Sequence, residues 1–213
     1  MANDNPPYMT TFAPSSAADA ANLPPVVIVH GIFRDHQHMG RLRKAFTLAG
    51  RRVLTPDLRS KAGAVGLDEL AAQFGDYLEG NLTAGERCDV IGHSMGGMVA
   101  RAFIQRHGGR KRVRRLVTLA APHHGTLMAW LWPGRGVRDL RPGSAFLRDL
   151  ARDAARLEGV EVTSYWTPFD LMIVPASSSR LPVGRNVRVN LPHHQSLVTN
   201  TRLARELVAL LND

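Results

Sequence analysis

Gly92-His93-Ser94-Met95-Gly96-Gly97 is the stretch of this sequence that decides the fold. It lies between an apolar run, Cys88–Ile91, and a helix-like run, Met98–Ile104. The pattern predicts a strand, a sharp turn and a helix, with glycines on both sides of the turn because a Cβ there would clash. The turn would lift the Ser94 hydroxyl clear of the sheet edge. The helix beginning at Met95 would direct free N–H groups toward developing negative charge.

The bulk composition predicts one globular domain over residues 23–213. The chain has 213 residues, of which 44% are hydrophobic, and no apolar run approaches the roughly 20 residues of a membrane span. Residues 1–22 are polar and proline-containing, without a basic start or a continuous apolar region, so we expect a mobile tail and no signal peptide. A cytoplasmic monomer is the default expectation, without integral membrane association. The single Cys88 precludes an intramolecular disulfide and is expected to be a buried structural thiol.

The net charge is +9, and nearly all of the positive charge is arginine. We expect the densest basic cluster to be a solvated face that could still help docking onto anionic surfaces. A nucleic-acid patch is the alternative, but no aromatic residues are interleaved and no nucleic-acid motif is present, so no nucleic-acid partner is expected. The cluster comprises Arg106, Arg110, Lys111, Arg112, Arg114 and Arg115.

Apolar strand-like runs alternate with helical patterns along the chain. Helices are predicted over 38–49, 67–82, 95–107, 144–157 and 199–211, with Ser144 as an N-cap. Strands are predicted over 26–29, 52–55, 88–91, 115–119, 160–165 and 186–189. This alternation predicts an α/β fold with about six mostly parallel strands flanked by helices. Sites in such sheets lie beyond the carboxyl ends of the strands, so chemistry is expected just after each strand.

Residues suited to nucleophilic catalysis follow three of these strands. A serine needs an imidazole base, which in turn needs a carboxylate to hold its tautomer. Asp170 follows the strand 160–165, and His193 and His194 follow the strand 186–189. Only one of the two adjacent histidines can be the base, and Asp170 has the alternative role of stabilising a turn. The order serine, acid, histidine is the one required by hydrolases with this strand–turn–helix.

The other half of an oxyanion hole is expected from the loop after the first strand. The backbone N–H groups of Ile32 and Met95 are the predicted donors, and Gly31 would let the chain bend close to the substrate. His30 is expected to shape this loop. Four other histidines show no closed ligand spacing, so neither a metal nor another cofactor is expected. They are His36, His38, His123 and His124.

With these residues in place, the chain resembles the α/β-hydrolase superfamily. It resembles most the small bacterial lipases and esterases grouped with lipase class 2 and the GPI inositol-deacylase-like lipases. The segments that carry the resemblance are Val27–Ile32, Gly92–Gly97, Thr118–Thr126, Asp139–Ser144, Phe169–Pro175 and His194–Leu197. They span about residues 25–211.

The resemblance implies a minimal α/β-hydrolase fold and selects His194. Such families commonly have a His-x-Ser-Leu or His-x-x-Leu pattern at the catalytic histidine, preceded by glycine. The segment His194–Leu197 matches this pattern, and His193 departs from it by occupying the glycine position. A short cap over about residues 125–157 is also implied, its segment 125–143 covering the active site. Its apolar side chains would suit an acyl chain or a lipid interface, although they could equally fill an ordinary core. The acyl-site or cap candidates are Phe33, Leu127, Met128, Trp130, Leu131 and Trp132.

The leading hypothesis is a serine carboxylic ester hydrolase of the lipase or esterase type, acting on hydrophobic acyl esters through an acyl-enzyme. Its catalytic residues would be Ser94, Asp170 and His194, and its substrate a small or lipid-like ester, at an interface or on a polyester. An acyltransferase or thioesterase with the same triad is an alternative. A non-catalytic binding protein on a hydrolase scaffold is the alternative of another class.

Overall fold

The computed structural model describes residues 23–32, 39–58 and 63–213. Its described residues contain a six-stranded sheet in the order β2-β1-β3-β4-β5-β6, in which every neighbouring pair is parallel. The strands are β1 (Val26–Val29), β2 (Val53–Leu54), β3 (Cys88–His93), β4 (Val113–Leu119), β5 (Glu161–Trp166) and β6 (Arg185–Arg188). The expected number and direction of the strands are therefore confirmed.

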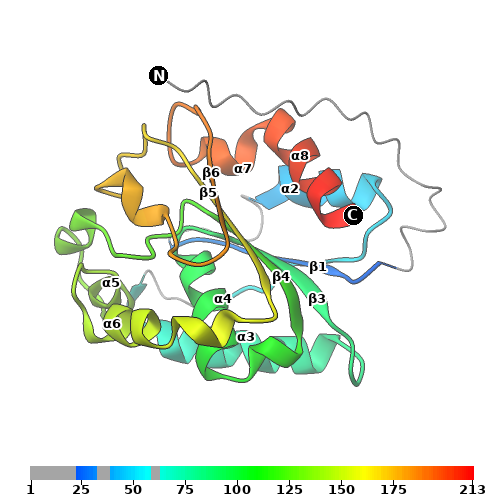
Figure 1. The fold of residues 1–213 in the computed structure, drawn as a ribbon, viewed down its shortest axis with the longest axis horizontal. Helices are drawn as coiled ribbons and strands as arrows, with labels where there is room; N and C mark the ends of the chain where they lie inside the picture. The colour runs from blue at the N-terminus through cyan, green and yellow to red at the C-terminus, as the bar shows by residue number, and fades with distance from the viewer. Residues whose placement is uncertain (1–22, 33–38, 59–62) are drawn as a thin grey trace.

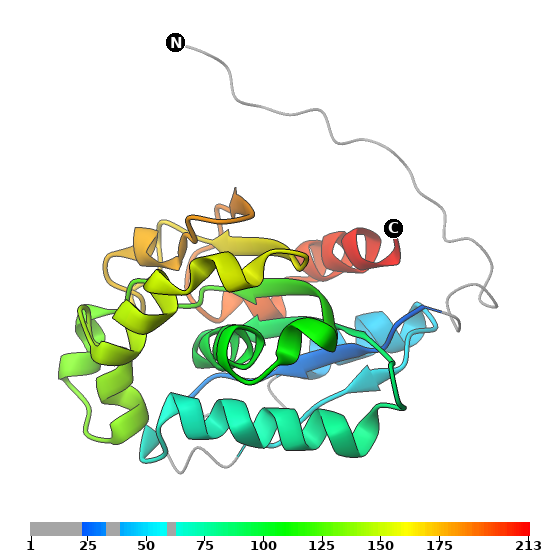
Figure 2. The same cartoon turned by 60° about the horizontal axis from the view of Figure 1, so that its bottom comes forward.

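Helices cover both faces of this sheet (Figure 1). One face packs against α3 (Leu67–Asn81), α4 (Met95–Arg106) and α6 (Ala145–Arg152). The other packs against α2 (Gly40–Leu48), α7 (Ser196–Thr199) and α8 (Thr201–Asn212). Figure 2 shows α3 and α8 along opposite sides of the molecule. The remaining short elements are α5 (Arg135–Asp139) and the 3₁₀ helices η3 (Gly109–Lys111), η4 (Leu127–Trp130), η5 (Ala154–Leu157) and η6 (Ala176–Ser179).

The strand β1 shows why its sequence is apolar throughout. Val27 and Val29 join the core beneath α3 and α4, whereas Val26 and Ile28 join the core beneath α2 and α8. Successive side chains of a strand point to opposite faces, so a strand covered on both faces has no polar position. The chain runs from β1 outward to β2 and then returns to β3 on the other side of β1. The strand order reverses between β1 and β3, which is where ligands bind in open parallel sheets.

The predicted helix over 144–157 is wrong in its second half. Ser144 caps it as expected, accepting from the Leu147 N–H at 3.2 Å, but α6 ends at Arg152 and η5 follows. Hydrogen bonds from side chains of α4 explain why α6 ends there. Arg101 Nη2 donates to the Leu150 carbonyl at 2.8 Å, and Gln105 Nε2 donates to that carbonyl and to the Asp153 carbonyl. Side chains of α4 thus take over carbonyl groups that a continuing helix would use.

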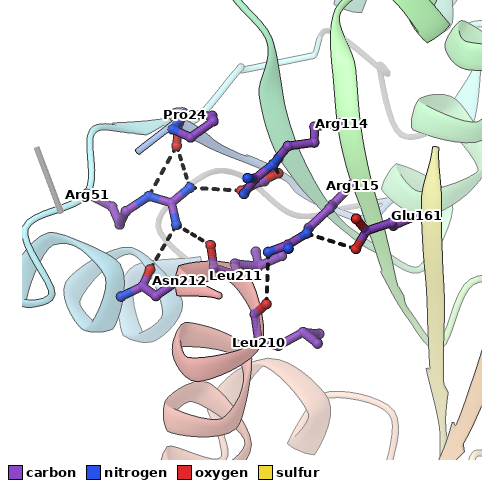
Figure 3. A network of polar contacts seen from close by, with 9 residues as sticks. Pro24, Arg51, Arg114, Arg115, Glu161, Leu210, Leu211 and Asn212 are labelled. Atoms are coloured by element: carbon purple, nitrogen blue, oxygen red, sulfur yellow. Dashed lines mark hydrogen bonds and ion pairs between the residues drawn. The ribbon is translucent and has the colours of Figure 1, made fainter. Parts of the chain in front are cut away.

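A buried ion cluster joins the start of β1 to the end of α8 at the amino ends of the strands (Figure 3). Asp89, at the start of β3, accepts from Arg51 Nη2 at 2.9 Å and from Arg114 Nη2 at 2.8 Å. Arg51 also donates to the Pro24 carbonyl before β1 and, at 2.6 Å, to the Leu211 carbonyl of α8. One guanidinium therefore holds the entry to β1 and the last turn of α8 against the middle of the sheet.

Several arginines of the basic cluster are paired with carboxylates. Arg112 contacts Glu79 and Arg115 contacts Glu161, with the guanidinium of each pair less exposed than the carboxylate. Arg106 lies 3.2 Å from Asp68. Much of the cluster's charge is consequently neutralised locally. No helix within the part of the chain that the structure describes is long and apolar enough to cross a membrane. The predicted tail, residues 1–22, lies outside the described residues.

Candidate active site

Ser94 occupies the sharp turn between β3 and α4. Its backbone has φ 53° and ψ −124°, a strained combination for a residue with a Cβ. A Cβ added at Gly92 would lie 2.5 Å from the Gly97 Cα, and one at Gly96 would collide with the carbonyl oxygens of Val29 and His30. The expected need for glycines around the turn is therefore confirmed. Gly92 packs against the first turn of α4, and Gly96 packs against the end of β1.

The loop after β1 passes directly against Ser94. A Cβ added at Gly31 would lie 3.1 Å from the Ser94 Cβ, and the next residue, Ile32, lines both cavities that contain Ser94. Met95 is the first residue of α4, and N–H groups of a first helical turn have no partner within the helix. Both predicted oxyanion donors, the N–H groups of Ile32 and Met95, thus belong to chain segments adjoining Ser94.

Asp170 and His194 form a buried hydrogen-bonded pair. His194 Nδ1 lies 2.7 Å from Asp170 Oδ2. The other carboxylate oxygen accepts from the N–H groups of Met172 and Ile173, at 2.8 and 2.9 Å. These bonds fix the carboxylate, which in turn makes Nδ1 the protonated nitrogen of the imidazole. The loops after β5 and β6 bring the two residues together.

Ser94 and His194 line the same cavity of about 470 Å³. Within the described part of the chain, no hydrogen bond joins their side chains; such bonds are often long in unliganded enzymes and tighten with substrate. His194 is buried and His193 is exposed, so the adjacent side chains diverge as expected. The structure therefore brings Ser94, Asp170 and His194 to one site, whereas His193 is an exposed residue at the rim of the same cavity.

His93 is a neighbour of His194 that the sequence did not reveal. Its ring centroid lies 4.6 Å from that of His194, and its Nε2 lies 3.4 Å from the His194 carbonyl oxygen. It is the residue before Ser94 and ends β3. The only sequence signal was its place in the turn motif, where side-chain identity is unconstrained. We conclude that His93 supports the loop carrying His194.

The cap candidates divide between a cavity and the surface. Met128 and Trp132 line a second cavity with Ser94, together with Met172, which the sequence did not single out. Leu127, Trp130 and Leu131 are 53%, 60% and 67% exposed and line neither cavity that contains Ser94. They do not fill an ordinary core. Phe33 lies outside the described residues.

Two other histidines have structural positions. His30 accepts from the Leu58 N–H at Nε2 and bonds the Gly31 carbonyl at Nδ1, so it shapes its loop as expected. His123 is buried, and its Nε2 lies 3.0 Å from the Thr118 hydroxyl. Burial lowers the pKa of His123 well below its ordinary value, and the nearby Arg101 adds to this. No group of three metal-ligating side chains occurs in residues 23–32, 39–58 and 63–213.

The model of the palmitoyl protein thioesterase family matches residues 25–179. The chain belongs to this family. The match includes β1, the turn with Ser94 and the loop with Asp170, and it ends before His194. Family membership and fold together support an ester hydrolase.

Solved structures of lipases and a thioesterase share the fold. The mature Bacillus licheniformis lipase BlEst2 superposes with a TM-score of 0.72 at 18% identity, covering 89% of this chain and 92% of that one. For Aspergillus fumigatus lipase B the TM-score is 0.73 at 18% sequence identity, and the match covers 90% of this chain but 53% of the lipase. For the thioesterase domain from the curacin biosynthetic pathway the TM-score is 0.66 at 14% sequence identity, and the match covers 91% of this chain and 92% of that domain. No curated protein matched the sequence. The α/β-hydrolase fold is thereby established.

Proposed function

We propose that the protein is a serine ester hydrolase in which Ser94 is the nucleophile, His194 the base and Asp170 the acid. The observation that carries this proposal is the 2.7 Å contact between His194 Nδ1 and Asp170 Oδ2, made beside the cavity that contains Ser94. Since Nδ1 is protonated toward Asp170, Nε2 keeps a free lone pair. That nitrogen can take the Ser94 proton as the oxygen attacks an acyl carbon.

The remaining steps follow from the same groups. The tetrahedral oxyanion would be held by the N–H groups of Ile32 and Met95, at the positive end of α4. His194 then returns its proton to the leaving oxygen or sulfur, which departs and leaves an ester on Ser94. Water, deprotonated by His194, attacks that ester and releases the acid. Each proton taken by His194 is given back within the same half-reaction.

Replacement of Ser94 tests this function. We expect Ser94→Ala to lower kcat for p-nitrophenyl butyrate by roughly 10⁵- to 10⁶-fold, the scale seen when such a nucleophile is removed. Ser177, an exposed serine on η6, provides the control, and Ser177→Ala should keep the wild-type kcat. Circular dichroism would establish that both variants are folded. Turnover retained by Ser94→Ala would refute the proposal.

A thioester is the second candidate substrate, favoured by the family to which the chain belongs. The proposed triad serves both chemistries, because the acyl-enzyme is the same and only the departing atom differs. Ethyl butyrate and its S-ethyl thioester differ in that atom alone. Their ratio of kcat/KM, measured by titration of the released acid, would identify the preferred bond.

Apolar side chains around the mouth of the site support hydrophobic esters as the substrates. Leu171 and Met172, on the loop after Asp170, are 78% and 43% exposed and line the cavity with Ser94. A substrate covering them would remove apolar surface from water, which stabilises the complex by about 25 cal/mol for each Å² buried. We also propose that the protein is a monomer and that its ester substrates are met at a lipid interface. Residues 125–157 would form the cap of the hydrolase domain.

A further inference from the structure

Ser94 lies where two cavities of very different size meet. The larger, of about 470 Å³, contains His194 and Gln195, and the smaller, of about 50 Å³, lies beneath η4 and α5. Ile32 and Met172 line both. Building on the proposed function, we propose that the smaller cavity is the acyl site, so that the enzyme prefers short acyl groups, of about butyryl length, and places the longer part of the ester on the leaving-group side.

Proton transfer decides which cavity takes which part of the ester. The leaving oxygen must lie near the imidazole that protonates it, so the leaving group extends to the side of His194. That side is the larger cavity, whose lining also includes His193 and Gln195. No histidine is among the described residues of the smaller cavity. An acyl group attached to Ser94 and directed away from His194 therefore enters the smaller cavity.

The volume of the smaller cavity limits the acyl length. A group the size of a methylene or a water needs at least roughly 10–15 Å³ of such a cavity, so 50 Å³ holds about three or four of them beyond the carbonyl, which corresponds to a butyryl or pentanoyl group. Cavities that enclose larger ligands measure roughly 300–1,000 Å³. The larger cavity falls within that range and the smaller one far below it.

The walls of the smaller cavity have little room to retreat. Val137 and Ile173 are each only 3% exposed. A Cβ added at Gly63 would lie 2.7 Å from side-chain atoms of both Ile32 and Val137, so backbone already packs behind these two side chains. Interiors packed at this density resist expansion. A longer acyl chain would leave past Trp132, which is 49% exposed, and would gain little from burial.

Two isomeric esters test this inference directly. Octyl butyrate and butyl octanoate contain the same atoms and have similar hydrophobicity, but they place the long chain on opposite sides of the ester bond. We expect kcat/KM, measured on dissolved substrate by acid titration, to be at least about tenfold higher for octyl butyrate, since one excess methylene in a filled pocket costs about tenfold or more. Equal values, or a preference for butyl octanoate, would overturn the inference.

Two variants in the same 3₁₀ helix sharpen the test. Met128 lines the smaller cavity, so Met128→Ala should enlarge it and reduce the preference for octyl butyrate about tenfold. Trp130 lines neither of the two cavities; its ring lies under the Arg141 guanidinium, 4.4 Å from it, and Trp130→Ala should keep the wild-type ratio. A ratio unchanged in Met128→Ala, or shifted equally in both, would count against the assignment. Ser94→Ala separates the two hypotheses: if this variant is inactive and the wild-type enzyme prefers butyl octanoate, only the assignment of the acyl site is refuted.

Discussion

Thr126 Oγ1 donates to the Met172 carbonyl oxygen at 2.9 Å and accepts from the Val174 N–H at the same distance. Its hydroxyl thus joins the start of η4, of which Thr126 is the N-cap, to the loop that carries Asp170. The Met172 N–H in turn bonds the Asp170 carboxylate. A single side chain at the start of η4 therefore helps to position the acid of the proposed triad.

Removal of this hydroxyl should reduce both stability and turnover. Thr126→Val keeps the shape of the side chain but removes the hydroxyl partner of the Met172 carbonyl and of the Val174 and Met128 N–H groups, so we expect a loss of about 1–3 kcal/mol in the free energy of unfolding. Displacement of the Asp170 loop should lower kcat about tenfold, with less change in KM. Urea unfolding and ester kinetics measure the two effects, and Thr126→Ser should restore both.

Thr47 on α2 provides a matched control, because it is exposed and lies on the opposite face of the sheet. Thr47→Val should change the free energy of unfolding by less than about 0.5 kcal/mol. A wild-type kcat in Thr126→Val would show that the acid loop is held without this hydroxyl.

The two adjacent histidines should behave very differently when each is removed. His194 is buried against Asp170, whereas His193 is exposed. We expect His194→Ala to lower kcat at least about 10³-fold, because Ser94 loses its base, and His193→Ala to stay within about tenfold of wild type. Steady-state kinetics on a dissolved ester gives both values. The reverse order of effects would make His193 the base.

The sequence predicts the centre of this molecule better than its periphery. The turn around Ser94 is a local pattern, and Asp170 and His194 follow strands whose carboxyl ends must meet in a parallel sheet. The contact between His93 and His194 depends instead on how two loops distant in sequence approach each other. No periodicity or spacing encodes such an approach, so it was missed.

The short helix η4 illustrates a second limit of sequence reasoning. Met128 and Trp130 are equally apolar and two residues apart, yet one lines a cavity and the other lies on the surface beneath Arg141. Short 3₁₀ segments offer too few turns for a face to be read from spacing. The end of α6 was missed for a related reason, because Arg101 and Gln105 come from another helix to bond its carbonyls.

Asp89 should be among the most sensitive buried positions for stability. Its side chain is fully buried, as is that of Arg51, and Arg114 also bonds it. Asp89→Asn removes the negative charge and leaves the Arg51 guanidinium buried without compensation, so we expect the free energy of unfolding to fall by about 3–5 kcal/mol. Urea denaturation at pH 7 measures this loss.

Asp68 is the matched control for Asp89, since it pairs with Arg106 at the surface. Exposed ion pairs contribute about 1 kcal/mol or less, so Asp68→Asn should be nearly neutral. Similar losses in the two variants would show that burial of the Asp89 cluster adds nothing to its stability.

His123 should make the protein less stable as the pH falls. Burial holds the pKa of this imidazole well below 6.5 in the folded protein, and its Nε2–H donates to Thr118 while the ring is neutral. Below pH 6.5 the unfolded chain binds a proton at this ring and the folded protein does not. The free energy of unfolding should therefore fall with decreasing pH by up to about 1.4 kcal/mol per pH unit on account of this residue, and this contribution is fully present above pH 6.5. Urea unfolding at pH 7.5 and 5.5 measures the slope, which should be shallower in His123→Gln. Identical slopes in wild type and His123→Gln would mean that His123 titrates alike in both states.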